Sequence, residues 1–527
     1  MKHTCMTAWH PNLAESRKWL YFSLLSVFIW GMLAHGYRFV HDSFTHDSLS
    51  EFNGLVYGNA IKFESGRFLV PLYRNIFRTD LTLPWLIGIL SLVWLSLAVF
   101  LVLRAFQVRS KIVAFLIAGI FTVNISVIAT TATYLHDLDC DLFGVMCAAA
   151  AIYLWKKLPY GWIIGAFFVV APLGIYQSNI SVVITLVMMV CLFDLMEGER
   201  FSSVMKLGMK SIGMILIGGA LYFFSLQIVE SVTNIPLSTT NSNSLSIILT
   251  LSPQELITNL FAAYQNTLYR LKNVFSPYSM EIVQGATGLL ACLSLGCVIL
   301  WLCNRRISLA SKLLCVVLIL LLPLGANITY VLANGEVHDL MVFSVWLLYL
   351  LPLLLADRLS WQLRSRLPEQ TPDLLCMLPR FLSAALIFFL LYGNVQTANT
   401  LYLKKDLEQK AYSSLMTRIV YDMERIDAYV PGTTPVVFAG FSDQIRPVRG
   451  TENYSQIIGV WRPGTIIMED PACYQAYFDY VLAHPAKIAD ASDWYSMLVD
   501  PRVSDMPTYP AAGSIAFLDD ILVVRLG

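Results

Sequence analysis

The chain has 527 residues, of which 57% are hydrophobic and only 14% charged, and its mean hydropathy is +0.62. A soluble chain of this length would divide into domains of ordinary polarity, whereas here the apolar residues come in runs of about 20, the length that crosses a bilayer. The composition therefore predicts a polytopic α-helical membrane protein. The net charge of zero gives no sign of a nucleic-acid partner, and we expect none.

The apolar runs predict about eleven transmembrane helices. They cover residues 19–34, 81–102, 113–132, 144–154, 162–173, 180–195, 212–229, 282–301, 313–331, 341–355 and 381–392. Lys and Arg collect on alternate connections, which are cytoplasmic by the positive-inside rule. The N-terminus is therefore expected inside, and the C-terminus outside.

Two domains follow from this pattern. Residues 1–396 form a membrane domain with external loops at 35–80, 133–141, 230–281 and 333–339. Residues 397–527 have the composition of a soluble segment and predict an external α/β domain. Its strand-like runs are PVVFAG, TIIMED, SIAFL and ILVVRL, and the last two are spaced as a β-hairpin.

The first external loop combines carboxylates with cations, which a plain tether would not require. Its candidate residues are the acids Asp42 and Asp47 and the cations Lys62, Arg67 and Arg74. A carboxylate near the membrane surface can deprotonate a hydroxyl, and cations can hold a phosphate leaving group. This is the chemistry of sugar transfer from a lipid-linked donor. The alternative is an ordinary solvated loop.

Two further external loops carry acids at helix ends. One holds Asp137, Asp139 and Asp141, and the other holds Glu336, His338 and Asp339. The three aspartates could bind Mg²⁺ or Mn²⁺ through oxygen ligands, or could orient sugar hydroxyls. The alternatives are loop solubility or, for Asp141 and Asp339, capping of the helices that they precede.

Four segments in order resemble the phage-type, serotype-converting O-antigen glucosyltransferases of the glucosyl transferase II (Gtr) family. They are THDSLSEFNG with SGRFLVPLYRNIF, TYLHDLDCDLFGVMCAAAAIYLWKK, APLGIYQSNISVVI, and MPTYPAAGSIAFLDDILVVRLG. Asp47 lies where the family has the second acid of a pair, Arg67 keeps the Gly-Arg element, and Tyr176 with Gln177 matches a Tyr-Gln segment. The chain departs from the pattern at His46, at Ser50-Glu51 and at Phe68, where the family has Pro.

The resemblance implies a GT-C-like membrane fold and an enzyme of the bacterial inner membrane. It would transfer glucose from undecaprenyl-phosphate-glucose to O-antigen repeats of lipopolysaccharide on the periplasmic side. We expect catalytic roles for Asp47, Asp42, Asp137 and Asp139, with Asp47 as the base. We expect donor-phosphate or substrate binding by Lys62, Arg67, Arg74, Tyr176, Gln177, Glu336 and His338.

Two alternative functions remain open. A transporter or flippase would show internal repeats and ionisable residues near the midplane of the membrane, whereas here the charges gather at external helix ends. An O-antigen polymerase or ligase would rely on arginine-rich external loops rather than on several acidic ones.

Overall fold

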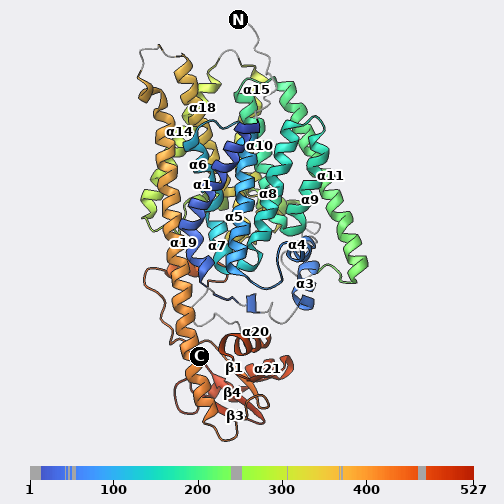
Figure 1. Cartoon of the computed structure of the whole chain (residues 1–527), viewed down its shortest axis with the longest axis vertical. Helices are drawn as coiled ribbons and strands as arrows, with labels where there is room; N and C mark the ends of the chain where they lie inside the picture. The colour runs from blue at the N-terminus through green and yellow to red at the C-terminus, as the bar shows by residue number, and fades with distance from the viewer. Residues whose placement is uncertain are drawn as a thin grey trace.

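The computed structural model is mostly helical, with a small sheet near its C-terminus (Figure 1). It describes residues 13–41, 43–45, 48–49, 55–238, 252–304, 307–366, 368, 372–460 and 470–527. The N-terminal end of the chain and the C-terminal sheet lie at opposite ends of the helical bundle.

Nine helices in the described chain are long and apolar enough to cross a membrane, which confirms a multi-pass membrane protein. The helices that provide these spans are α1 (Leu13–Val40), α5 (Pro84–Ala105), α8 (Leu135–Lys157), α10 (Ile180–Met196), α11 (Phe201–Thr233), α14 (Met280–Leu302), α15 (Leu309–Ala326), α18 (Leu350–Arg366) and α19 (Asp373–Glu424). The span that contains α18 begins at Phe343, in α17 (Phe343–Trp346), and continues through the short helix η4 (Leu347–Tyr349).

The other two predicted crossings correspond to irregular helices. The run 113–132 is divided into α6 (Lys111–Thr122) and α7 (Ile125–Thr133), which are bent by 40°. Asn124 causes this break, because its side chain accepts a hydrogen bond from the first turn of α7 while its amide donates to two carbonyls of α6. The run 162–173 forms α9 (Gly161–Ile175), which is shorter than a full span. The predicted number of eleven transmembrane helices therefore depends on whether the bent pair α6–α7 and the short helix α9 each cross the membrane.

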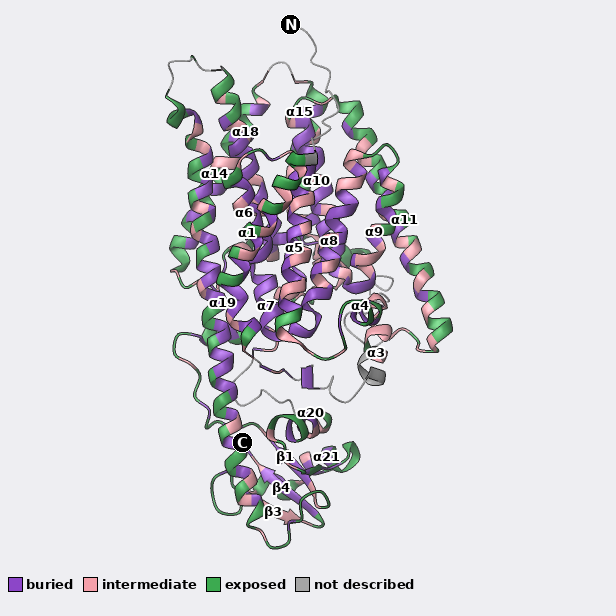
Figure 2. Cartoon of the chain, viewed as in Figure 1, coloured by how far each residue is buried: buried purple, intermediate pink, exposed green. Residues whose placement is uncertain are grey.

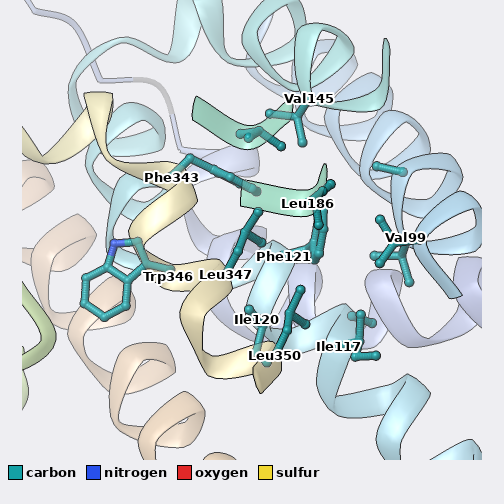
Figure 3. Packing of buried hydrophobic residues seen from close by; sticks show 14 of the residues in the cluster. Val99, Ile117, Ile120, Phe121, Val145, Leu186, Phe343, Trp346, Leu347 and Leu350 are labelled. Carbon is teal, nitrogen blue, oxygen red and sulfur yellow. The ribbon is translucent and has the colours of Figure 1, made fainter. Parts of the chain in front are cut away.

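The helices divide into an inner and an outer set (Figure 2). The apolar windows of α8 and α10 are 72% and 83% buried, whereas those of α11 and α14 are only 22% and 28% buried. In the inner set, Phe121, Leu186, Leu347 and Leu350 pack together in the main hydrophobic core (Figure 3). Apolar side chains on the outside of the bundle are what a lipid-facing surface requires.

The connections rich in Lys and Arg meet at one end of the bundle. Arg358 of α18 pairs with Glu197, which follows α10, at 2.6 Å, and donates to the carbonyl of Phe106, which follows α5, at 2.6 Å. Helix α1 also begins at this end of the bundle (Figure 1). The structure therefore brings together the loops that the charge pattern assigns to one side of the membrane.

Short elements cover the other end of the bundle. The predicted first loop contains α3 (Leu55–Glu64) and α4 (Leu69–Phe77), and the predicted loop 230–281 contains α13 (Pro253–Leu271). A capping box between Ser252 and Glu255 begins α13. The remaining short elements of this end are η2 (Gln177–Asn179), α16 (Ile328–Leu332) and η3 (Asp339–Met341). Helices α3 and α4 lie at the end of the bundle that faces the C-terminal sheet (Figure 1).

The C-terminal region contains a four-stranded sheet in the order β2-β1-β4-β3. Its elements are β1 (Pro435–Ala439), η5 (Glu452–Gln456), α20 (Pro471–Ala476), η7 (Tyr477–Leu482), β2 (Lys487–Ile488), α21 (Ala491–Leu498), α22 (Pro501–Asp505), β3 (Ile515–Leu518) and β4 (Ile521–Arg525). Strands β3 and β4 are antiparallel and adjacent, so the predicted hairpin is confirmed, with Asp519 at φ 55° in its turn. The predicted strand TIIMED lies outside the described residues.

The predicted boundary between residues 396 and 397 falls inside a continuous helix. Helix α19 runs from the membrane bundle to the sheet (Figure 1). Its second half is tied to the first external segment, because Tyr37 donates to Asp406 at 2.8 Å and Gln409 donates to the carbonyl of Phe44. A change in composition marks where a helix leaves the apolar layer, but it does not require the helix to end there.

Candidate active site

The three aspartates of the predicted loop 133–141 belong to a helix. Helix α8 begins at Leu135 with Tyr134 as its N-cap, so Asp141 lies within the second turn and does not cap the helix. Residues four apart lie on the same helical face, whereas residues two apart point in nearly opposite directions. Asp137 and Asp141 therefore share a face, and Asp139 points away from both.

Asp137 is held by two cations of the first external segment. Lys62 of α3 and Arg74 of α4 both form ion pairs with its carboxylate, the latter at 2.7 Å. Both side chains of the Arg74 pair are at least nine-tenths buried. Predicted site residues from two distant segments thus meet here, but they neutralise one another.

Asp139 forms a second buried ion pair, with Arg78, at 2.9 Å, and neither side chain is exposed to solvent. Arg78 follows α4 and also donates to the carbonyl of His136. Arg78 is one of the cations of the predicted first loop, but the sequence predicts no role for it. No local pattern indicates this pairing, because Arg78 lies beyond the end of α4 in an extended backbone conformation.

We expect Asp139→Asn to lower the free energy of unfolding by about 3–5 kcal/mol, because the buried charge of Arg78 would lose its partner. The measurement is the thermal unfolding midpoint of the purified protein in detergent. Asp519→Asn is the matched control, since Asp519 pairs with Arg502 at 2.9 Å on the surface, where loss of a pair costs about 1 kcal/mol or less. An Asp139→Asn protein with unchanged stability and reduced turnover would instead place Asp139 in catalysis.

Arg67 lies beside these pairs and has no carboxylate partner among the described residues. Its guanidinium lies 4.6 Å from the centre of the Tyr176 ring, and its Nε is buried without a hydrogen-bond partner. A buried guanidinium nitrogen without a partner is costly, and an anion that accepts two hydrogen bonds from the planar guanidinium, such as phosphate, would satisfy it. Among the described cations of the site, Arg67 is therefore the one available to a ligand.

The turn before Arg67 is built around Gly66, which has φ 72°. Tyr222 of α11 donates to the Gly66 carbonyl at 3.2 Å, and Gln177 donates to the Ser65 carbonyl at 2.8 Å. A Cβ on Gly66 would lie 2.7 Å from the Tyr222 hydroxyl, so only glycine fits. Gln177 therefore positions Arg67, and Tyr222 is a supporting residue that the sequence analysis missed.

Asp141 is the acid of α8 that is not neutralised by direct pairing. Its half-buried carboxylate has no hydrogen bond or ion pair within the part of the chain that the structure describes, although it interacts electrostatically with Arg67 and Lys62. An available carboxylate and an available guanidinium thus lie together at the start of α8.

The predicted metal site does not fit this geometry. Asp137 and Asp139 are paired with Lys62, Arg74 and Arg78, and the helix turns Asp139 away from Asp137 and Asp141. Across the described ranges, no three His, Cys, Asp or Glu side chains form a group that could hold a metal ion. The hypothesis of Mg²⁺ or Mn²⁺ bound by these three residues is therefore not supported by their arrangement.

The third acidic segment lies in a neighbouring group. Asp339 pairs with Arg270 of α13, while His338 and Glu336 are exposed. Burial raises the pKa of the Asp339 carboxyl, and the charge of Arg270 opposes that shift. Asp339 therefore belongs to an ion pair and does not serve mainly as a helix cap, while the exposed Glu336 side chain forms no ion pair with another residue that the structure describes.

An apolar cluster connects this segment to the first group. Met341 belongs to one buried cluster with Tyr176 and Cys140. The guanidinium of Arg67 lies over the Tyr176 ring, and Cys140 directly precedes Asp141 in the chain.

The two other predicted acids, Asp42 and Asp47, lie outside the described residues. Their roles remain predictions from the sequence.

Apolar helices long enough to cross a membrane, with a polar site at one end of their bundle, define a multi-pass membrane protein. The model of the Glucosyl transferase GtrII family matches residues 36–355, more than half of the chain, and the chain belongs to this family. It is therefore a glycosyltransferase family member, as the resemblance predicted. The match ends at Leu355, before α19 and the C-terminal sheet. No curated protein and no solved structure matches the chain significantly.

Proposed function

We propose that the protein transfers glucose from undecaprenyl-phosphate-glucose to O-antigen repeats of lipopolysaccharide, on the periplasmic face of the bacterial inner membrane and with a GT-C-like membrane fold. The observation that carries this proposal is the available guanidinium of Arg67 beside the available carboxylate of Asp141. Family membership supports glucosyl transfer over the transporter and over the polymerase or ligase.

In this reaction the acceptor hydroxyl loses its proton to a carboxylate, and its oxygen bonds to the anomeric carbon of glucose. The bond between that carbon and the phosphate oxygen breaks, and its electrons remain on undecaprenyl phosphate. Arg67 stabilises the developing negative charge, because guanidinium binds phosphate bidentately. Asp47 is the base that the family pattern indicates, and Asp141 is the carboxylate of α8 that interacts electrostatically with Arg67.

Asp137 and Asp139 have a different role in this proposal. Their ion pairs with α3, α4 and Arg78 attach the first external segment to the start of α8. They are positioning residues, because each carboxylate is already neutralised and neither is available to accept a proton from the acceptor.

The direct test is transfer of radiolabelled glucose by the purified protein from undecaprenyl-phosphate-glucose to the polysaccharide of lipopolysaccharide. Labelled polysaccharide is the expected product. Label that crosses a proteoliposome membrane without joining the polysaccharide would indicate a transporter. Polysaccharide that grows by whole repeats without incorporating glucose would indicate a polymerase.

The periplasmic placement of the C-terminal region can be tested by its topology. Because Lys and Arg gather at the opposite end of the bundle, an alkaline phosphatase fused after Gly527 should be active. A fusion at Gly198, in the turn between α10 and α11, is the matched control and should be inactive. An inactive phosphatase after Gly527, together with a fluorescent cytoplasmic reporter at the same point, would contradict this orientation.

A further inference from the structure

A second cavity, of about 150 Å³, lies beside the candidate active site. It is formed by the end of α13 and the turn after it, the segment at 337–339, α17, and Gln456 from η5 of the C-terminal region. Three aromatic side chains line it, Tyr269, Phe275 and Trp346. A cavity of about this size accommodates one six-membered ring.

Two residues that line the cavity, Trp346 and Asn273, each have a buried polar atom with no hydrogen-bond partner in the described part of the chain: Nε1 of Trp346 and Oδ1 of Asn273. Trp346 is only 4% exposed and Asn273 only 6%. The amide nitrogen of Asn273 donates to Asn394 at 2.7 Å, which leaves its oxygen as the unused acceptor. Figure 3 shows the Trp346 indole turned away from the labelled aliphatic core residues. An unsatisfied donor and an unsatisfied acceptor each cost about 1–3 kcal/mol unless a ligand or water binds them.

The charges around the cavity indicate a neutral ligand. Arg270 and Asp339 both line it, but they pair with each other. Arg67, by contrast, has no carboxylate partner within the described ranges at the neighbouring site. The ligand that fits must donate and accept hydrogen bonds, present an apolar face to aromatic rings and carry no charge. A polyhydroxylated ring, that is, a sugar, has all of these properties.

The cavity is also connected to the candidate active site. Val337, His338 and Asp339 line it, and Met341 of the same segment packs against Tyr176, over which Arg67 lies. On the other side, Gly459 follows η5 and lies against Thr133, just before α8. A chain that enters the cavity would thus be held beside the start of α8.

We propose that this cavity binds one sugar ring of the acceptor polysaccharide and so positions the acceptor hydroxyl for transfer. Trp346 donates to a ring hydroxyl, Asn273 accepts from one, and Tyr269 provides an aromatic face. This inference rests on the proposed function for the identity of the acceptor. Since η5 supplies Gln456, it also gives the C-terminal region a part in acceptor binding.

The test measures binding without catalysis. The probe is the polysaccharide released from the host's lipopolysaccharide, and its Kd for the purified full-length protein is measured in detergent with no donor present. We expect Trp346→Phe, which removes the N–H but keeps a ring, to raise the Kd by roughly 2- to 10-fold, the range of one lost hydrogen bond. Tyr269→Ala and Gln456→Ala change exposed residues, so they keep the test valid if Trp346→Phe folds poorly.

Leu268→Ala is the matched control, because Leu268 precedes Tyr269 on α13, is 64% exposed and does not line the cavity. The donor KM should be unchanged in all four variants, while the acceptor KM should rise in the three cavity variants. A wild-type Kd in all three would overturn the inference and leave water as the partner of Trp346 and Asn273. Polysaccharide binding that depends on Tyr269 and Trp346, without any glucose transfer, would support the cavity and contradict the proposed function.

Discussion

Asp47→Asn is expected to lower the rate of glucose transfer by a factor on the order of 10² or more, the usual scale for a lost general base. Asparagine keeps the shape and hydrogen-bonding capacity of the side chain but cannot accept the proton. Expression and donor binding should stay normal, because the charge of the base acts on the acceptor. The measurement is kcat with radiolabelled donor at saturating acceptor.

Asp141→Asn and Asp42→Asn belong in the same experiment. Asp141 is available in the structure and interacts electrostatically with Arg67, so it is the strongest rival for the role of base. If Asp47→Asn transfers glucose at a near-normal rate while Asp141→Asn or Asp42→Asn is slower by a factor on the order of 10², the acid replaced in the slower variant is the general base.

Arg67→Lys is expected to remove most of the activity while the protein still inserts into the membrane. Lysine keeps the positive charge, but it lacks the planar guanidinium group, which binds phosphate through two N–H groups and stacks on an aromatic ring. The loss should appear in both the donor KM and kcat, because the phosphate gains charge as the sugar leaves. Steady-state kinetics with varied donor concentration measure both.

Arg425→Lys is the matched control for this substitution. Arg425 also lies over a tyrosine ring, at 5.6 Å from the centre of Tyr421, but in the distant end of α19. Its replacement should leave turnover unchanged. Near-normal turnover of Arg67→Lys would mean that Arg67 only anchors the protein to lipid headgroups, which lysine does equally well.

The sequence by itself determined the membrane class, the positions of the apolar helices and the β-hairpin at the C-terminus. These features depend on local chemistry: a run of about 20 apolar residues must cross the bilayer as a helix, and two alternating strands with a short polar link must fold back. The family was also recognisable, since four short segments occur in order and the family model matches residues 36–355. The sequence indicated Lys62, Arg67, Arg74 and Asp137 as residues of two predicted loops, and the structure pairs Lys62 and Arg74 with Asp137.

Only the tertiary structure decided which charges are paired and which are available. Asp137, Asp139 and Asp141 are equivalent in the sequence, but the rotation of α8 directs them to different neighbours, so two are neutralised and one is not. The cavity of Trp346, Asn273 and Gln456 was likewise absent from the sequence analysis. Those residues are more than 70 positions apart, and no local pattern specifies contacts that form when distant helices pack.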